Sequence, residues 1–238
     1  MYLWSVINTY DTMKTRIITL LLFLLTTSLF TLAQKDVTTF LGIPVDGHKS
    51  EMRNKLIKNG FTPKTENGDE FFEGEFNGTD VSVYIVTNNN KVYRIMLMDK
   101  HSQNETNIKN RFNRLVSQFE ANPRYHEPGM DFRIPEKENI SYEMIVNKKI
   151  YEAAFYQKSD SSTIRNQVLQ ELKNEYTEEQ LNNPDESLEQ LILIKTFSHE
   201  LDSFSKKSVW FRINERFGKY YIVMYYDNEY NHANGEDL

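Results

Sequence analysis

The chain contains no cysteine, and this absence removes several classes of site at once. Without a thiol there is no disulfide bridge, no thiolate metal ligand and no cysteine nucleophile. A chain without such bridges must rely on its hydrophobic core, which is feasible at about 200 residues. Small secreted animal domains often depend on disulfides, so an exported chain of this composition would be more typical of a bacterial envelope.

Glycine, proline and excess basic charge are also scarce. The nine glycines and six prolines build no Gly-x-Ser-x-Gly elbow, no glycine-rich phosphate loop and no long flexible linker. The formal net charge is −6, with acidic and basic side chains well mixed, so no basic stripe attracts a phosphate backbone. We therefore expect neither a nucleic-acid partner nor a cofactor.

No apolar run reaches the roughly 20 residues that a membrane-spanning helix needs. The strongest run, Ile17–Leu25, follows Lys14 and Arg16 and precedes the small residues of Thr31-Leu32-Ala33. This three-part pattern is typical of a cleavable secretory signal peptide. The alternative is an uncut membrane anchor, which the shortness of the run and the threonines of its second half disfavour.

The predicted signal peptide spans residues 1–33, and cleavage after Ala33 leaves Gln34 as the new amino terminus. Met13 is the expected start, because the first twelve residues contain no basic side chain and include Asp11. No cysteine follows the run, so no lipid-modified terminus can form. We expect a periplasmic or secreted protein without a stable membrane anchor.

Residues 34–238 predict an α+β fold with antiparallel sheets covered by helices on one face, arranged as two related lobes. The amino-terminal lobe spans 34–121, a charged connection spans 122–139, and the carboxyl-terminal lobe spans 140–238. In the first lobe we expect a helix ending near Asn59, strands at Phe71–Phe76, Val81–Thr87 and Val92–Met98, and a covering helix capped by Asn104. Glu51 follows His48 at the spacing of a capping box.

The second lobe should open with a hairpin of Ile140–Val146 and Ile150–Gln157. Two main helices are expected next, separated by a capping box at Thr177–Gln180. The apolar stripe of the long second helix is Leu188, Leu191, Ile194, Leu201 and Phe204. Two strands, Val209–Asn214 and Tyr220–Tyr226, close the lobe. A permuted internal repeat suggests related lobes, although chance similarity between hairpins explains the pattern equally well.

Catalytic and metal sites find little support. His199-Glu200 begins like a zinc-protease motif, but Ser203 stands where the second histidine is required. The five histidines are scattered singly, so no metal site is expected. Glu73 and Glu75 would share one face of a strand, as a carboxylate pair could, but the same alternation describes a half-solvated sheet.

The residues best suited to binding form an aromatic cluster near the carboxyl terminus. Tyr and Trp are common contact residues for proteins, and their rings also stack on sugars. On a strand, Tyr221, Val223 and Tyr225 share one face, whereas Tyr220, Ile222, Met224 and Tyr226 share the other. One face must be core, and the other is the candidate surface if solvent reaches it. The candidate binding residues are Tyr220, Tyr221, Tyr225, Tyr226 and Trp210.

Several turn and cap segments resemble a group of uncharacterised secreted proteins from Bacteroidetes-type bacteria. They are Phe40–Gly47 (FLGIPVDG), Glu75–Gly78 (EFNG), Tyr226–Asn228 (YDN) and Asn234–Leu238 (NGEDL). The resemblance implies a bacterial envelope location and no known activity. His48 departs from it, because serine is expected at that cap.

These observations favour a non-catalytic extracytoplasmic binding or interaction protein, whose partner is an unknown envelope protein or a glycan. Two alternatives stay open. One is an envelope hydrolase with paired carboxylates between the lobes, and the other is a carbohydrate-binding module that uses exposed tyrosines.

Overall fold

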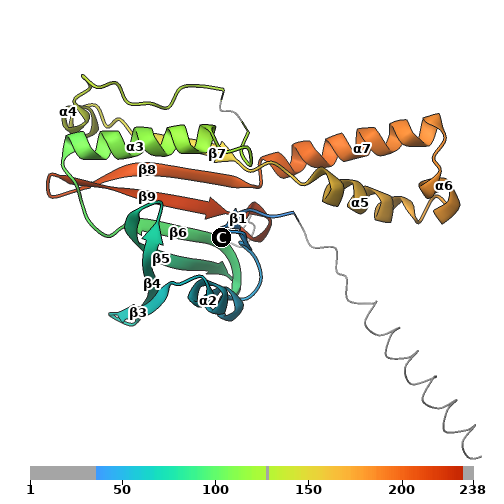
Figure 1. Cartoon of the computed structure of the whole chain (residues 1–238), viewed down its shortest axis with the longest axis horizontal. Helices are drawn as coiled ribbons and strands as arrows, with labels where there is room; N and C mark the ends of the chain where they lie inside the picture. Colours follow the sequence, from blue (N-terminus) through green and yellow to red (C-terminus); the bar gives the residue numbers. More distant parts are fainter. Residues whose placement is uncertain (1–35, 127–128, 233–238) are drawn as a thin grey trace, which may run out of the picture. The chain divides into compact units, whose positions relative to one another are not determined.

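The computed structural model describes residues 36–126 and 129–232 (Figure 1). The predicted signal peptide and the Asn234–Leu238 segment lie outside the described residues. From Asp36 onward the chain forms one compact unit.

Seven strands build one antiparallel sheet, with the order β3-β4-β5-β6-β9-β8-β7 (Figure 1). A separate two-stranded sheet pairs β1 (Thr39–Phe40) with β2 (Ile43–Pro44). The strands of the large sheet are β3 (Thr62–Glu66), β4 (Asp69–Phe76), β5 (Thr79–Asn88), β6 (Lys91–Asp99), β7 (Glu152–Tyr156), β8 (Ser208–Arg216) and β9 (Lys219–Asp227). The β4–β5 turn has Asn77 and Gly78 at φ of 51° and 71°, as the Asn-Gly hairpin signal predicts.

The helices are α2 (Lys49–Lys58), α3 (Glu105–Glu120), α4 (Ile140–Ile145), α5 (Ser161–Leu172), α6 (Glu178–Asn182) and α7 (Glu186–Phe204), with a short 3₁₀ turn at Glu229–Asn231. The Asn104 cap is confirmed, since its Oδ1 accepts from the Asn107 amide at 2.9 Å. The Thr177–Gln180 capping box is also present. His48 is the N-cap of α2 but makes no side-chain cap bond, so the capping-box expectation there was wrong.

The mixed α+β architecture with helices on an antiparallel sheet is confirmed. Strands from both predicted lobes, however, belong to the same sheet, because β6 of the first half pairs with β9 of the second. The described parts of the two predicted lobes, 36–121 and 140–232, thus contribute to one compact unit. Side chains from both halves form one hydrophobic core. The pairing of β6 with β9 also leaves no unpaired strand edge between the halves.

Two segments differ from the prediction. Ile140–Val146 was expected to be a strand, yet Ile140–Ile145 is a helix. Asn139 caps this helix by accepting from the Tyr142 amide at 2.9 Å, and the apolar side chains at its end face solvent instead of a sheet partner. The edge strand β3 was missed because all five of its residues are exposed and carry no alternating apolar pattern.

Helices α2 and α3 cover one face of the large sheet. Helix α2 packs on β5 and β6, and α3 packs on β8 and β9 (Figure 1). The core beneath α3 includes Phe112 and Phe119, whose rings lie 5.1 Å and 5.6 Å from that of Phe211. Neither α2 nor α3 packs on the other face of the sheet. At the β7 edge of that face, Phe204 of α7 stacks on Tyr156, with ring centroids 4.6 Å apart.

The helices α5, α6 and α7 form an insertion between β7 and β8 (Figure 1). We call residues 161–204 the helical insertion. It has a small hydrophobic core of its own, separate from that of the sheet, formed by Val168, Leu172, Leu181, Leu188 and Ile192.

Candidate functional site

The face of the large sheet opposite α2 and α3 is the candidate site, and we call it the open face. It arises from strand alternation, because every second side chain of β4, β5, β6, β8 and β9 points away from the core. Most of these side chains are half-buried, so solvent reaches the surface that they form. On a sheet face that no helix covers, a ligand or partner can contact side chains that the strands hold in fixed positions.

The structure separates the predicted binding residues into two groups. Tyr220 and Tyr226 belong to the helix-covered core, with 2% and 4% of their surface exposed, so they are not part of the open face. Ile222 and Met224, which lie between them on the same face of β9, also point into the core. Tyr221, Tyr225 and Trp210 point to the open face. Tyr221 and Trp210 are half-buried there, whereas Tyr225 is only 8% exposed and supports the surface from beneath.

An aromatic row crosses five strands of the open face. The row consists of Phe71, Tyr84, Met96, Tyr225 and Trp210. Cross-strand register places Tyr84 opposite Met96, Met96 opposite Tyr225, and Tyr225 opposite Trp210. Large apolar groups are therefore aligned perpendicular to the strands, where cross-strand neighbours support one another.

The rings of the row form two stacked pairs. Trp210 and Tyr225 have centroids 4.0 Å apart and planes 20° apart, and Phe71 and Tyr84 have centroids 5.6 Å apart and planes 23° apart. In each stacked pair, the inner faces of the two rings contact each other. Sugar stacking needs a free ring face, so this arrangement suits contact with protein side chains better than a flat glycan platform.

An ion pair fixes one end of the row. Arg94 donates from Nε to Oδ1 of Asp227 at 2.6 Å and from Nη2 to Oδ2 at 2.8 Å. Trp210 donates from Nε1 to the same Oδ2 at 2.8 Å. Burial alone would lower the pKa of Arg94, but the hydrogen bonds and charge of Asp227 outweigh it and raise that pKa. The guanidinium lies over the Tyr225 ring, 4.8 Å from its centroid.

A second arginine on the open face has no ion-pair partner among the described residues. Arg212 lies two residues after Trp210 on β8 and opposite Val223. Its Nε is buried and makes no hydrogen bond. A buried donor without an acceptor costs free energy. Because the Arg212 charge has no carboxylate partner among the described residues, it favours an acidic group on a partner. Arg212 also lines a surface cavity with Lys148, Asn214 and Tyr221.

Sequence reasoning missed most of these partners. Phe71, Tyr84 and Met96 were predicted to lie in strands, but the face of the sheet to which their side chains point was not predicted. Arg94 was not identified as a candidate residue. The alternation in Val81–Tyr84 and Ile95–Met98 carries a weak signal, since Tyr84 and Met96 are out of phase with the core residues Val83 and Ile95. The contact between Arg94 and Asp227 spans 133 positions in the sequence and leaves no local pattern.

Two of the residues weighed as catalytic candidates have partners in the structure. His199 lies beside Glu171 of α5, with Nε2 and Oε2 3.3 Å apart, so it links two helices of the insertion. Glu73 pairs with Lys100 at 2.8 Å, and the hydrogen bond from Lys100 lowers the pKa of Glu73. A general acid requires the opposite shift. Glu75 is exposed on the same strand.

A cavity of about 270 Å³ lies between the β1–β2 turn and the end of α3. Its polar lining includes Gln118, Arg124, Tyr125 and Gln157 but no carboxylate and no histidine. Gln157 already holds the small sheet, because its side chain accepts from the Thr39 amide at 2.8 Å and donates to the Thr39 carbonyl at 2.8 Å. This cavity thus offers no carboxylate pair. Glu73 and Glu75 instead line a different surface cavity, of about 330 Å³, together with Asp80 and Lys100.

Metal ligands and membrane spans were sought across residues 36–126 and 129–232. No group of three or more His, Asp or Glu side chains in this part of the chain could hold a metal ion. No helix of the same residues is long and apolar enough to cross a bilayer.

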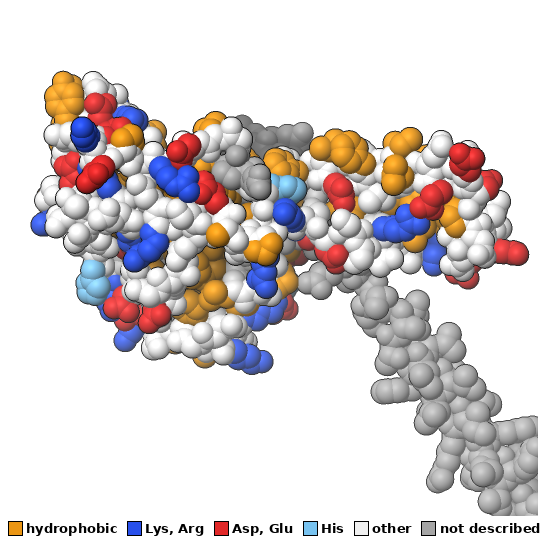
Figure 2. All heavy atoms as spheres, turned by 45° about the horizontal axis from the view of Figure 1, so that its top comes forward, with side chains coloured by type: hydrophobic (Ala, Val, Ile, Leu, Met, Phe, Trp, Pro, Cys, Tyr) orange, Lys and Arg blue, Asp and Glu red, His pale blue; other side chains and the backbone are white. Residues whose placement is uncertain are grey.

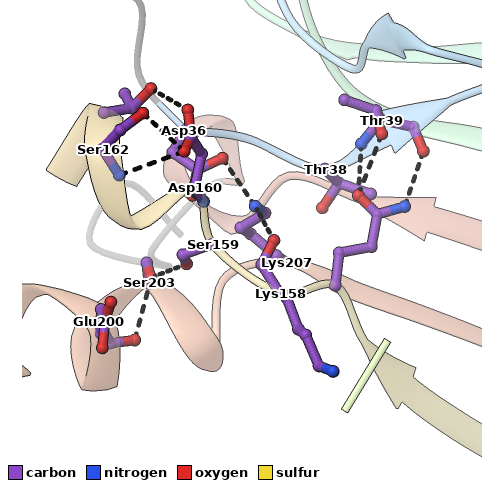
Figure 3. A network of polar contacts seen from close by, with 12 residues as sticks. Asp36, Thr38, Thr39, Lys158, Ser159, Asp160, Ser162, Glu200, Ser203 and Lys207 are labelled. Atoms are coloured by element: carbon purple, nitrogen blue, oxygen red, sulfur yellow. Dashed lines mark hydrogen bonds and ion pairs between the residues drawn. The ribbon is translucent and has the colours of Figure 1, made fainter. Parts of the chain in front are cut away.

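A polar network holds the root of the helical insertion (Figure 3). Lys207, 3% exposed, donates from Nζ to Oδ1 of Asp36 at 2.7 Å and to the carbonyl of Lys158 at 3.0 Å. The hydroxyls of Ser159 and Ser203 lie 2.5 Å apart, which joins the start of the insertion to its end. The network fixes the insertion to the segment that follows the predicted cleavage point.

No protein-family model, no curated protein and no solved structure matches this chain.

Proposed function

We propose that this chain is a non-catalytic binding protein that works outside the cytoplasm and contacts a protein partner through its open face. The aromatic row on the uncovered side of the sheet carries the proposal. Trp, Tyr and Arg are the residue types that contribute most to protein interfaces, and Trp210, Tyr225 and Arg212 lie together here. The flexible side chains of Met96 and Met98 add an adaptable apolar surface between the aromatic pairs.

The chemistry of the open face also defines what the partner should offer. The row favours apolar side chains, and the positive charge of Arg212, which no carboxylate of the described residues pairs with, favours an acidic group. A partner segment that presents apolar groups beside an Asp or Glu satisfies both requirements. A neutral glycan supplies no charge to pair with Arg212, and the inner faces of the stacked rings are closed to it.

The predicted export is a second basis for the proposal and does not depend on the open face. The signal-peptide pattern of residues 13–33 is the basis for a periplasmic or secreted location. Mass spectrometry of the natively expressed protein should find Gln34 at the amino terminus in the envelope or medium fraction. An intact terminus in the cytoplasmic fraction would contradict export.

The binding claim is tested with three versions of the chain from Gln34 onward. The wild type, Trp210→Ala and Phe217→Ala are immobilised, and envelope extract of the native bacterium is passed over each. Phe217 is the control, because it is 90% exposed in the β8–β9 turn and lies outside the row. We expect one protein to be retained by the wild type and the Phe217 variant, and lost with Trp210→Ala.

Binding of the same three versions to a glycan array distinguishes a carbohydrate ligand from a protein partner. A glycan signal that disappears with Trp210→Ala or Tyr225→Ala would establish the carbohydrate-binding alternative instead. Equal protein retention by all three versions would remove the open face from the interaction.

A further inference from the structure

The helical insertion is much longer than a connection between β7 and β8 requires. It joins β7 to β8, which are adjacent strands with Tyr156 opposite Ser208. A hairpin between neighbouring strands needs only about two to five residues. Residues 157–207 fill this connection with three helices and a small core of their own. Long connections that are not needed for closure are frequently functional.

Helix α7 has two apolar sides, and only one of them is buried. Leu188 and Ile192 point into the core of the insertion. Leu193, Ile194, Phe197 and Leu201 point away from it, and each is 59–65% exposed. We call these four residues the α7 stripe. Figure 2 shows hydrophobic side chains gathered on the surface of the insertion.

The spacing of the α7 stripe is that of a helix-packing surface. Ile194, Phe197 and Leu201 follow one another at intervals of three and four, so they lie on one side of α7. At one end of the stripe, Phe197 and Leu201 line a cavity of about 270 Å³ with Phe204 and His126. The stripe thus offers both a ridge and an adjoining hollow, and contiguous exposed apolar surface of this kind marks interaction sites.

The negative charge of the helical insertion indicates which kind of partner the α7 stripe can bind. Residues 161–204 contain nine acidic and three basic side chains, a net charge of −6. The other described residues contain 21 acidic and 22 basic side chains, so the negative charge is concentrated on the insertion. Pairing two copies of the insertion would bring like charges together. Helices that lie on anionic membranes carry basic polar faces, which α7 lacks.

We infer that the α7 stripe binds an amphipathic helix of a protein partner whose polar flanks are basic. Apolar residues of that helix cover the stripe, and its Lys or Arg side chains face the acidic groups of the insertion. This surface is separate from the open face and does not depend on the function proposed for it. The root network of Lys207 and Asp36 holds the insertion in place, so the stripe is presented from a fixed base.

The test uses two designed helical peptides with identical leucine heptads. The basic peptide has lysine at the remaining positions, and the acidic peptide has glutamate there. Binding of each labelled peptide to the chain from Gln34 onward is measured by fluorescence anisotropy at low and high salt. We expect the basic peptide to bind at least tenfold more tightly than the acidic one, and less tightly as salt rises.

Variants locate the binding surface. Phe197→Ser and Leu201→Ser should each weaken binding of the basic peptide at least tenfold. Both side chains are mostly exposed, so circular dichroism and thermal unfolding should stay unchanged. Phe217→Ser, which removes an exposed Phe outside the insertion, should bind like the wild type. If one stripe variant fails to fold, the other still decides the result.

Four outcomes would overturn the inference. The basic and acidic peptides could bind equally or not at all, or Phe197→Ser and Phe217→Ser could have equal effects. Sedimentation could show that the chain alone is a dimer that Phe197→Ser dissociates, which would assign the stripe to a second copy. Co-flotation with anionic lipid vesicles that requires Phe197 would assign the stripe to a membrane.

Discussion

Arg94 and Asp227 meet across the β6–β9 boundary through two parallel hydrogen bonds, of 2.6 Å and 2.8 Å. The pair joins the two halves of the sheet and supports the aromatic row, because Asp227 also accepts from the indole of Trp210 at 2.8 Å. The side chain of Asp227 is 4% exposed, whereas that of Arg94 is 23% exposed. A planar guanidinium suits this bidentate geometry better than an ammonium group.

Removing the arginine should therefore leave a buried, uncompensated carboxylate. We expect Arg94→Leu to lower the free energy of unfolding by about 2–4 kcal/mol in urea denaturation. The double variant Arg94→Leu/Asp227→Asn should recover part of this loss, because no isolated charge then remains. Strict additivity of the two single changes would show that the pair is not coupled.

Gly74 on β4 has no space for a side chain. A Cβ at this position would overlap the ring of Phe61, which packs in the core with 4% of its surface exposed. Gly74→Ala should cost about 1–3 kcal/mol of unfolding free energy through overpacking. Gly129→Ala is the matched control, because nothing lies within 4 Å of the added Cβ, and it should change stability by less than about 0.5 kcal/mol. Equal effects of the two changes would contradict the packing assigned to Phe61.

Truncation of two tyrosines of β9 should destabilise the protein to different extents. Tyr226 lies in the core, with its ring centroid 5.0 Å from that of Phe40, so Tyr226→Ala should cost about 3–5 kcal/mol. Tyr221 is half-buried on the open face, and Tyr221→Ala should cost less than about 1.5 kcal/mol. Chemical denaturation of both variants measures the difference, and a reversed order would mean that the faces of β9 are wrongly assigned.

Glu138 should make stability depend on acidic pH. Hydrogen bonds from Lys149 and Tyr151 lower the pKa of Glu138 below its ordinary value of 4.5. As pH falls through 4.5, the unfolded chain takes up the proton before the folded chain does, so this carboxylate's contribution to stability declines until the folded pKa is passed. Glu138→Gln should flatten the stability profile of the wild type in this range. A parallel profile for the variant would remove Glu138 from the acid response.

Period-two patterns predicted most of the sheet from the sequence, and capping residues predicted α3 and α6. The faces of β9 could not be chosen, because apolar side chains point both ways along Tyr220–Tyr226 and only the covering helix distinguishes them. The α7 pattern was misleading for a physical reason. Ile194 and Leu201 were expected to form part of the helix's core stripe, but they face solvent while Ile192 is buried. Long-range contacts such as that of Arg94 with Asp227 have no local signature.

Photo-crosslinking from the centre of the aromatic row tests the central claim most directly. Met96 lies between Tyr84 and Tyr225 in the row, and a photoreactive benzoylphenylalanine replaces it in the native bacterium. The same replacement at Phe217 is the control. The account predicts a discrete protein adduct in the envelope fraction from position 96 and none from position 217. The absence of an adduct at position 96, or the same adduct from both positions, would contradict it.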